Sequence, residues 1–369
     1  MDQRIIVYVG TYTCPIKFGT GEILEGKGEG IYLLELNIDT GKLEHIQTVA
    51  DVLNPSYLVF NRNNSCLYAV NELKEFEGKV SGSVSGFRAG EDHTLTYINK
   101  QASGGSDPCF VEVNSGGTHL YVCNFMSGSV CVFSIGADGS VEPYSQLIQH
   151  EGSSVNLKRQ SGPHPHSFLF SPDGQYALVP DLGLDKVVIY RVDGETNLLS
   201  EEPVSYFSTS TGAGPRHATF DPQGRYLYLI NELDCTIVAL EYYPESGGLT
   251  ELQTVSSLPE GVDVANNSCA DIHITPDGTY LYGSNRGHDS LVCYRVEQKS
   301  GLLSYVNCQP SGGKTPRNFA IDPTGRYLLC ANQDSDNILV FEINYRTGEL
   351  EEKSRITIPT PVCVKPYLF

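Results

Sequence analysis

The sequence predicts an all-β fold, a seven-bladed β-propeller of four-stranded antiparallel blades, on the basis of three observations. Turn-forming residues are frequent, with 37 glycines and 20 prolines in 369 residues, which favours many short strands over long helices. One phrase returns along the chain: an alternating strand, a turn such as DPQG, and a second strand that ends in Asn or Asp. The phrase has a fixed internal spacing and occurs in seven copies, the first incomplete, which is the pattern of propeller blades.

The internal spacing is sixteen residues in every complete copy. It separates the landmark residues of the two strands, which are Pro55 and Asn71, Pro108 and Asn124, Pro165 and Asp181, Pro215 and Asn231, Cys269 and Asn285, and Pro316 and Asn332. An N-terminal half-copy ends in VYVGT at Thr11, so the Asn column has seven members separated by 47 to 60 residues. That interval fits one blade per copy.

Each copy alternates with a period of two, as in RHATFDPQGRYLYLIN, where the Pro and Gly of the turn suit a tight hairpin. A second hairpin follows, as in DKVVIYRVDGETNLL, which brings each copy to four strands. Because the first copy has only its later strands, we expect the C-terminal TPVCVKPYLF to supply the missing strand, so that N- and C-terminal strands close the ring in one blade. The prediction is a single domain over 1–369, since an open β-solenoid or two sandwiches rarely keep this spacing.

The charge balance and the hydropathy disfavour two classes of partner. With 44 Asp and Glu against 25 Lys and Arg, the formal net charge is −19, which argues against binding to nucleic acid phosphates. No stretch of 18 apolar residues occurs, so we expect no membrane partner. The 11 cysteines have no zinc-binding spacing and several lie inside apolar runs, which is typical of a reducing compartment. We therefore expect a cytoplasmic protein.

Two Gly-rich, acidic insertions interrupt the repeat at 14–30 and at 73–86. Neither stands in the strand and helix surroundings that a phosphate-binding loop needs. We interpret both insertions as surface loops near the mouth of the propeller.

Two columns of the repeat are expected to surround that mouth, because the innermost strand of a blade begins where the next strand ends. The residues that follow the landmarks are Ser56, Cys109, His166, Arg216, Ala270 and Arg317 in one column, and Glu72, Phe125, Leu182, Glu232, Arg286 and Gln333 in the other. Purely structural columns would tend to keep one residue type, whereas these diverge and collect charged groups. In a chain of net charge −19, arginines at one opening would attract anionic ligands. The alternative is that these polar residues only contact water at the rim of the opening.

Four of these side chains suit acid–base chemistry on an anion. Arg216 and Arg286 are the expected anion clamps, because a guanidinium can hold a carboxylate or phosphate through two hydrogen bonds. Glu232 is expected to pair with an arginine or to orient water, and His166 is of the side-chain type that most readily exchanges protons near neutral pH. The sequence has no GxSxG, no HExxH and no cysteine that the repeat pairs with a histidine, so activated water is the expected nucleophile.

His164 and His166 form an HPH pair, and this spacing on an extended chain directs both rings to one side. Such a pair is a possible start of a metal site. Apart from Cys109, however, the columns offer no third histidine or cysteine. We expect neither a metal nor a cofactor.

Long segments of the chain carry a family resemblance: VYVGTYT, PHPHSFLFSPDGQYALVPDLGLDKV, GAGPRHATFDPQGRYLYLINEL, YLYGSNRGHDSL and TPRNFAIDPTGRYLLCANQDSDNI. They resemble the propeller-type lactonases, which include the propeller form of 6-phosphogluconolactonase and, more distantly, the fungal 3-carboxy-cis,cis-muconate lactonizing enzyme. The catalytic residues that the resemblance implies are His166, Arg216, Glu232 and Arg286. His164 and Arg317 are additional candidates, for substrate binding, and the HPH and DLGLDKV phrases look more like the bacterial lactonase branch.

The resemblance implies a lactone hydrolase whose substrate is a small anionic sugar lactone or carboxylate, preferably the 6-phosphogluconolactone of the pentose phosphate pathway. Arg216 and Arg286 would hold the anionic group and polarise the lactone carbonyl, while His166 would activate water. Two alternatives stay open at this point. One is a cycloisomerase of the carboxymuconate lactonizing type, and the other is a non-catalytic propeller that binds a protein or a sugar acid.

Overall fold

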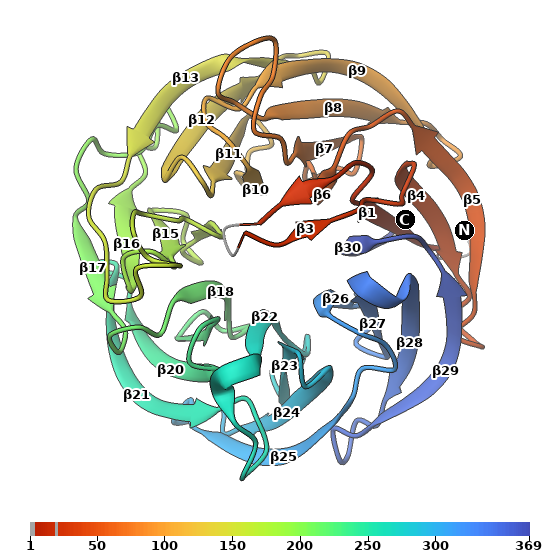
Figure 1. Ribbon diagram of the computed structural model, residues 1–369, viewed down its shortest axis with the longest axis vertical. Helices are drawn as coiled ribbons and strands as arrows, with labels where there is room; N and C mark the ends of the chain where they lie inside the picture. Colours follow the sequence, from red (N-terminus) through yellow and green to blue (C-terminus); the bar gives the residue numbers. More distant parts are fainter. Residues whose placement is uncertain (1–3, 19–20) are drawn as a thin grey trace. The chain divides into compact units, whose positions relative to one another are not determined.

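The computed structural model describes residues 4–18 and 21–369, which form β-strands along most of their length (Figure 1). Among these residues, seven sheets have four strands each, the composition of a seven-bladed β-propeller, so the predicted fold class is confirmed. The chain divides into two compact units. The first unit holds the residues up to Val9, Tyr32–Ile46 and Pro215–Phe369, and the second unit holds Gly10–Ile31 and Gln47–Gly214.

The two ends of the chain share one sheet, as the incomplete first copy of the repeat predicted. Its order is β30–β1–β4–β5, with bounds Pro361–Leu368, Ile5–Thr11, Gly30–Leu36 and Leu43–Ala50. Arg4 and Phe369 exchange backbone hydrogen bonds of 3.3 and 2.9 Å, which extend the pairing of β1 with β30. The C-terminal strand therefore completes a blade that the N-terminus begins.

Three further sheets lie in the first unit, each in sequence order. Their strands are β18 (Pro215–Phe220), β19 (Tyr226–Asn231), β20 (Thr236–Tyr243) and β21 (Gly248–Ser256); β22 (Ser268–Ile274), β23 (Tyr280–Arg286), β24 (Ser290–Val296) and β25 (Leu303–Pro310); β26 (Pro316–Ile321), β27 (Tyr327–Asn332), β28 (Asn337–Ile343) and β29 (Leu350–Thr357). The short 3₁₀ helices η1 (Val264–Asn266) and η2 (Gln333–Ser335) accompany them. In the part of the chain that the structure describes, no helix is long and apolar enough to span a membrane.

The second unit holds the other three four-stranded sheets and one small hairpin. Their strands are β6 (Pro55–Phe60), β7 (Cys66–Asn71), β8 (Ser83–Ala89) and β9 (Leu95–Ala102); β10 (Pro108–Val113), β11 (His119–Asn124), β12 (Ser129–Ile135) and β13 (Val141–Gln149); β14 (Leu169–Phe170), β15 (Tyr176–Asp181), β16 (Lys186–Arg191) and β17 (Ser205–Ser208); and the hairpin strands β2 (Ile16–Lys17) and β3 (Ile23–Leu24). The hairpin lies in the predicted insertion at 14–30, of which residues 19 and 20 are outside the described part.

The insertion predicted at 73–86 is shorter than expected, because β8 already begins at Ser83. The prediction was wrong for its last four residues. Small side chains made SGSVSG look like a loop, but Ser83 and Ser85 are buried and their hydroxyls donate to Oδ1 of Asn71 over 3.1 and 2.6 Å. These hydrogen bonds satisfy the buried serine hydroxyls, so the two serines can lie inside the sheet.

The sixteen-residue spacing is the register of each inner hairpin. The paired landmarks are Pro55 and Asn71, Pro108 and Asn124, Pro165 and Asp181, Pro215 and Asn231, Cys269 and Asn285, and Pro316 and Asn332. Directly after the proline, the register skips one residue in β6, β10, β18 and β26. In β22 it skips two residues after Cys269. A β-bulge re-aims the side chain of the residue that it leaves unpaired. Arg216 and Arg317 both occupy such positions.

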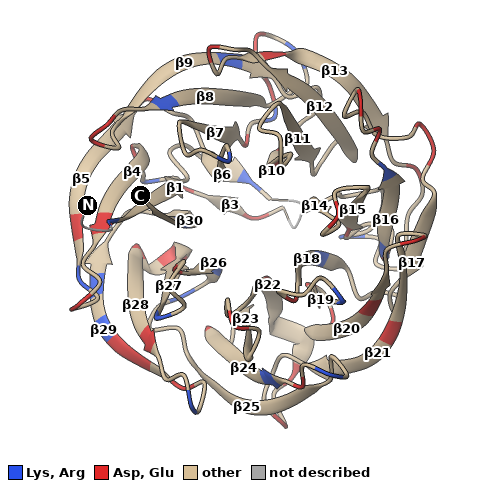
Figure 2. Ribbon diagram, turned by 180° about the vertical axis from the view of Figure 1, so that it is seen from behind, with Lys and Arg blue, Asp and Glu red and all other residues tan. Residues whose placement is uncertain are grey.

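Neighbouring sheets of the first unit pack together through apolar clusters. The cluster around Val7 and Leu329 joins the β30–β1–β4–β5 sheet to the β26–β29 sheet, and the cluster around Ile237 and Leu281 joins β18–β21 to β22–β25. Full burial of one such side chain stabilises a fold by about 1.5–3 kcal/mol. Charged residues instead gather in turns and on outer strands such as β21 and β29 (Figure 2). The charged side chains that are buried therefore need a separate explanation.

Candidate active site

Arg216, Glu232 and Arg286 form a buried ion-pair cluster in the first unit. Oε2 of Glu232 lies 3.0 Å from Nε of Arg216 and 2.9 Å from Nη2 of Arg286. The side chains of Arg216 and Glu232 are each only 3% exposed, and that of Arg286 is 16% exposed. One carboxylate thus serves two guanidinium groups, so the cluster keeps an excess of positive charge.

The start of β22 holds both arginines through its backbone. Arg216 donates from Nη1 to the carbonyl oxygen of Ala270, and Arg286 donates from Nη2 to that of Cys269 over 2.7 Å. The amide of Cys269 donates in turn to the carbonyl oxygen of Glu232 over 3.1 Å. The bulged start of β22 therefore anchors all three members of the cluster.

The electrostatics of Arg216 show how strongly positive this part of the first unit is. Burial and the charge of Arg286 lower the pKa of Arg216 to about 10, with Glu232 opposing them. Arg317 also contributes to the lowering of this pKa, so its charge acts on the cluster. Arg216 still carries its charge at neutral pH, which is the state that an anion binder needs.

Nε of Arg286 is a buried donor within the cluster. Nε of Arg286 is buried and makes no hydrogen bond to any residue in the described part of the chain. Buried N–H groups are nearly always paired, because an unpaired one costs about 1–3 kcal/mol. This N–H group can donate a hydrogen bond to an oxygen atom of a bound ligand.

His164 and His166 lie in the second unit, in the segment between β13 and β15. The amide of His166 donates to the carbonyl oxygen of Pro180, and the amide of His164 donates to Oδ1 of Asp181 over 2.7 Å. The ring of His164 stacks on Phe125 at 4.5 Å between centroids, and the ring of His166 meets Phe125 edge-on at 5.2 Å. Both imidazole rings therefore pack against the same aromatic ring, that of Phe125.

The proton position on His164 follows from its partner. Nδ1 of His164 lies 2.8 Å from the carbonyl oxygen of Phe125, and a carbonyl oxygen only accepts. Nδ1 therefore carries a hydrogen. Nε2 of His164 is the nitrogen that is left to contact a ligand.

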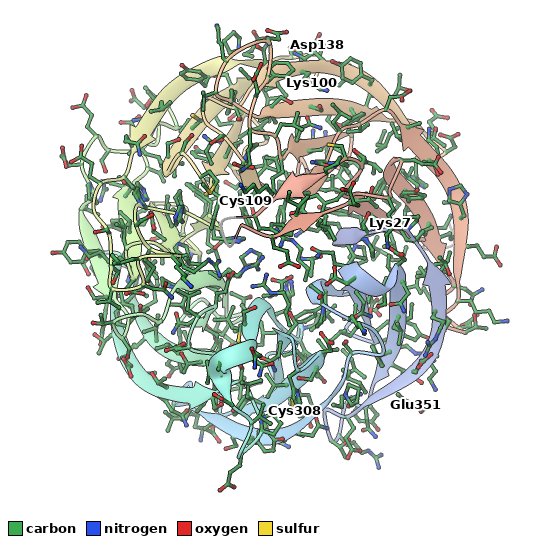
Figure 3. All side chains as sticks on the ribbon, in the orientation of Figure 1. Lys27, Lys100, Cys109, Asp138, Cys308 and Glu351 are labelled. Atoms are coloured by element: carbon green, nitrogen blue, oxygen red, sulfur yellow. The ribbon has the colours of Figure 1, made fainter. Side chains whose placement is uncertain are left out.

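Cys109 lies beside His166, and the sequence analysis missed this pair. Its Sγ is 3.8 Å from Nδ1 of His166, within reach of a weak hydrogen bond. Figure 3 shows Cys109 at the start of β10, whereas the labelled Lys100 lies on outer strand β9. The prediction that no cysteine meets a histidine was wrong. The signal was present, since Cys109 and His166 are neighbours in the first column of the repeat.

A second carboxylate of the repeat columns, Glu72, is buried in the second unit. Oε2 of Glu72 accepts a 3.0 Å hydrogen bond from the hydroxyl of Tyr12, which is fully buried. Asn54 fixes the backbone of Glu72 through two hydrogen bonds. Nδ2 of Asn54 donates to the backbone carbonyl oxygen of Glu72 over 3.2 Å, and the backbone amide of Glu72 donates to the backbone carbonyl oxygen of Asn54. Tyr12 is the seventh member of the second column, since it follows Thr11, and the sequence analysis left it out.

The structure thus assembles the predicted residues in two sets, one within each unit. Arg216, Glu232 and Arg286 contact one another, and Arg317 acts on them through its charge. His164 and His166 share Phe125. Within the described residues, no group of three or more His, Cys, Asp or Glu side chains is arranged to hold a metal ion. The predicted roles of all six residues stay predictions.

Comparisons with known proteins agree with the repeat. The family model described as "Lactonase, 7-bladed beta-propeller" matches residues 6–366. The 6-phosphogluconolactonase of Bacillus subtilis is 36% identical over 98% of this chain and 98% of its own length, and that of Formosa agariphila is 33% identical over 80% and 83%.

Solved structures show the same likeness in three dimensions. A Bacteroides fragilis protein assigned as a 6-phosphogluconolactonase has a TM-score of 0.89 and 35% identity, and the match covers 99% of this chain and 98% of that one. The periplasmic gluconolactonase of Pseudomonas aeruginosa has a TM-score of 0.87 and 31% identity, with 99% of both chains covered. The chain therefore belongs to the lactonase family of seven-bladed β-propellers.

Proposed function

We propose that the protein is a 6-phosphogluconolactonase, an enzyme that hydrolyses 6-phosphogluconolactone to 6-phosphogluconate in the pentose phosphate pathway. The names of the relatives in Bacillus subtilis and Formosa agariphila support this reaction. The observation that carries the proposal is the buried cluster of Arg216, Glu232 and Arg286, which keeps positive charge in a chain of net charge −19. A buried cationic cluster is suited to a small anionic substrate.

In the proposed reaction the arginines bind and polarise the substrate. Arg216 and Arg286 donate hydrogen bonds to the anionic substituent and to the carbonyl oxygen, on which negative charge develops during attack. Nε of Arg286, buried without a protein partner among the described residues, is one donor available for this purpose. Glu232 holds the two guanidinium groups in place. Loss of one such donor costs about 10²- to 10³-fold in rate in enzymes that stabilise an oxyanion.

His166 is the proposed general base. It takes a proton from water as the water oxygen bonds to the carbonyl carbon, and it returns the proton to the ring oxygen when the ring C–O bond breaks. Base catalysis of this kind contributes about 10²- to 10⁴-fold. We assign substrate binding to His164, through Nε2, and to Arg317. His166 and the arginines occupy the same two columns of the repeat.

We also propose that the protein works in the cytoplasm, with a small anionic lactone as its partner and without nucleic acid or membrane. Each of the 11 cysteines is free, and nine of them are buried. Free buried thiols persist in a reducing compartment. Cell fractionation with a periplasmic marker tests this proposal, since recovery in the periplasmic fraction contradicts it.

Hydrolysis of freshly prepared 6-phosphogluconolactone, measured against its spontaneous rate, tests the function. We expect acceleration by the wild type and a fall of at least 100-fold in kcat/KM for His166→Ala and for Arg216→Ala, with unchanged circular dichroism. Wild-type rates equal to the spontaneous rate exclude this substrate. Full activity in both variants overturns the assignment of roles.

A parallel assay with unphosphorylated glucono-lactone is informative, because the Pseudomonas aeruginosa relative carries the name gluconolactonase. We expect the phosphorylated lactone to have the higher kcat/KM. Equal values would assign the protein to neutral lactones instead. A carboxymuconate as third substrate tests the cycloisomerase alternative.

A further inference from the structure

Asp271 is a buried carboxylate in the interior of β22 that the proposed reaction does not use. It is 1% exposed. Its two oxygens lie within 2.5 to 3.3 Å of five nitrogen atoms, which are Nδ1 of His217, Nε2 of His273, Nδ2 of Asn318, and the amides of Ile272 and Phe319. Burial of a carboxylate costs free energy unless its oxygen atoms accept hydrogen bonds, and the oxygens of Asp271 have several donors around them.

The charge states of this group follow from its surroundings. Burial raises the pKa of Asp271, but the charges of and hydrogen bonds from His273 and His217 outweigh it and hold the pKa well below its usual value. Burial and the charge of Arg216 together lower the pKa of His217 to about 4, with Asp271 opposing them. At neutral pH, Asp271 is therefore an anion and His217 a neutral donor through Nδ1.

Asp271 and His217 each sit next to a residue of the arginine cluster. His217 follows Arg216 on β18, and Asp271 follows Ala270 on β22. Arg216 donates to the carbonyl oxygen of Ala270, and His217 lies 2.7 Å from Oδ1 of Asp271. Two adjacent residues of β18 are thus joined to two adjacent residues of β22 by one contact each.

Both pairs of residues lie where strand register is interrupted. The pairing of β18 skips Arg216, and the pairing of β22 skips Ala270 and Asp271. At a bulge the ladder no longer fixes the backbone, so side-chain contacts decide how the bulged residue points. The contact of His217 with Asp271 supplies that constraint.

The constraint continues to the other side of β22. Asn318 on β26 reaches Asp271 through Nδ2, and its Oδ1 accepts a 2.7 Å hydrogen bond from the amide of Val364 on β30. Asp271 is therefore held from both neighbouring strands. A carboxylate fixed in this way can hold His217, and with it the backbone of Arg216, in one position.

We propose that Asp271 is a positioning residue for Arg216, which acts by holding His217 and the bulged starts of β18 and β22 in register. The inference rests on the proposed role of Arg216 in substrate binding. Asp271 touches no substrate and takes part in no proton transfer. Its effect is to place the guanidinium of Arg216, and misplacement by about 1 Å can cost 10²-fold in rate.

The test compares Asp271→Asn in two backgrounds by a double-mutant cycle. In the wild-type background we expect kcat/KM for 6-phosphogluconolactone to fall about 10- to 100-fold. In the Arg216→Ala background the same substitution should lower it less than about twofold, because the group that Asp271 positions is already gone. Equal factors in the two backgrounds overturn the proposal.

Asp221→Asn is the matched control for general destabilisation. Asp221 is a buried aspartate in the β18–β19 turn, and its carboxylate accepts from the amides of Gln223, Arg225 and Tyr226. We expect it to lower the melting temperature but to change kcat/KM less than about threefold. An activity loss as large as that of Asp271→Asn would mean that both act through stability alone, against the proposal.

A second pair of variants keeps the inference testable if Asp271→Asn does not fold. His217→Asn keeps an N–H donor near the position of Nδ1, whereas His217→Leu removes it. We expect near wild-type kcat/KM for the first and a 10- to 100-fold fall for the second. The reverse order, or equal losses, contradicts the proposal.

A spectroscopic readout separates this inference from the proposed function. The Nε–H resonance of Arg216, assigned by its loss in Arg216→Ala, should shift or broaden in Asp271→Asn and stay in place in Asp221→Asn. This result would support positioning even if the wild type hydrolyses no 6-phosphogluconolactone. An unchanged resonance in Asp271→Asn overturns the inference whatever the substrate.

Discussion

Replacement of Glu232 by glutamine is the sharpest perturbation of the arginine cluster. Glu232→Gln keeps the size of the side chain and removes its charge. Oε2 of Glu232 lies 3.0 and 2.9 Å from nitrogens of Arg216 and Arg286, and burial leaves little water to screen the two cations. The variant therefore removes the carboxylate charge that both guanidinium groups contact.

The expected loss can be estimated from these distances. With charge centres about 4 Å apart and an effective dielectric constant near 20, each attraction is about 4 kcal/mol, which the cost of burying the charges partly offsets. Removal of one partner of a buried pair costs about 3–5 kcal/mol in unfolding free energy. Arg286→Gln should cost clearly less, because Glu232 keeps Arg216 as partner and Arg286 is the more exposed arginine.

Urea unfolding in a buffer free of phosphate and sulfate measures both losses. Added inorganic phosphate should then restore part of the stability of Glu232→Gln, because an anion that binds only the folded state stabilises it. Arg286→Gln should respond less to phosphate. A loss below about 1 kcal/mol in Glu232→Gln, or a larger loss in Arg286→Gln, would refute the reasoning.

Three further predictions concern other parts of the structure. Since the pKa of His217 falls from 6.5 to about 4 on folding, the wild type should lose up to roughly 3 kcal/mol of stability as pH drops through that interval, and His217→Asn should lack this loss in urea titrations at several pH values. Asp271 adds nothing there, because its carboxylate is ionised in both states above its usual pKa. Gly183→Ala should lower the melting temperature, since a Cβ would lie 1.9 Å from a backbone oxygen; an unchanged value contradicts this. Tyr12→Phe should cost about 1–3 kcal/mol, because Glu72 loses its hydroxyl donor; an unchanged urea midpoint argues against that bond.

The fold was predictable because its determinants are local. The pairing of Pro215 with Asn231 depends only on a turn between them, and such a spacing is visible in sequence. The structure differs from the predicted strands where contacts outside the hairpin determine the backbone conformation. Strand β14 contains only Leu169 and Phe170, and before it the pairing with β15 is reduced to an isolated bridge between Pro165 and Asp181. The amide of His164 there bonds to the side chain of Asp181 and not to the backbone of β15.

The site was predictable where a repeat position carries a charged residue, as with Arg216 and Glu232. Asp271 and His217 were missed because they stand one residue further along, in a column that is aromatic in the first two complete copies. Tyr57 and Phe110 fill that column there and stack at 4.1 Å. The next four members are all polar, namely Ser167, His217, Asp271 and Asn318, and this run was the available signal. Only the structure shows that His217 and Asn318 both contact Asp271.

Two of the buried carboxylates of the first unit, Glu232 and Asp271, help to explain why a charged substrate is expected. Glu232 neutralises one of the two arginines that it contacts, and Asp271 raises the pKa of Arg216 through its charge. Arg317 adds a third positive charge, since it also lowers the pKa of Arg216. A dianionic phosphate group gains from the positive potential of these arginines, whereas a neutral lactone does not. Discrimination between the two lactones should therefore weaken when Arg317 is replaced by methionine, because this substitution removes one positive charge and leaves the contacts of Glu232 with Arg216 and Arg286 in place.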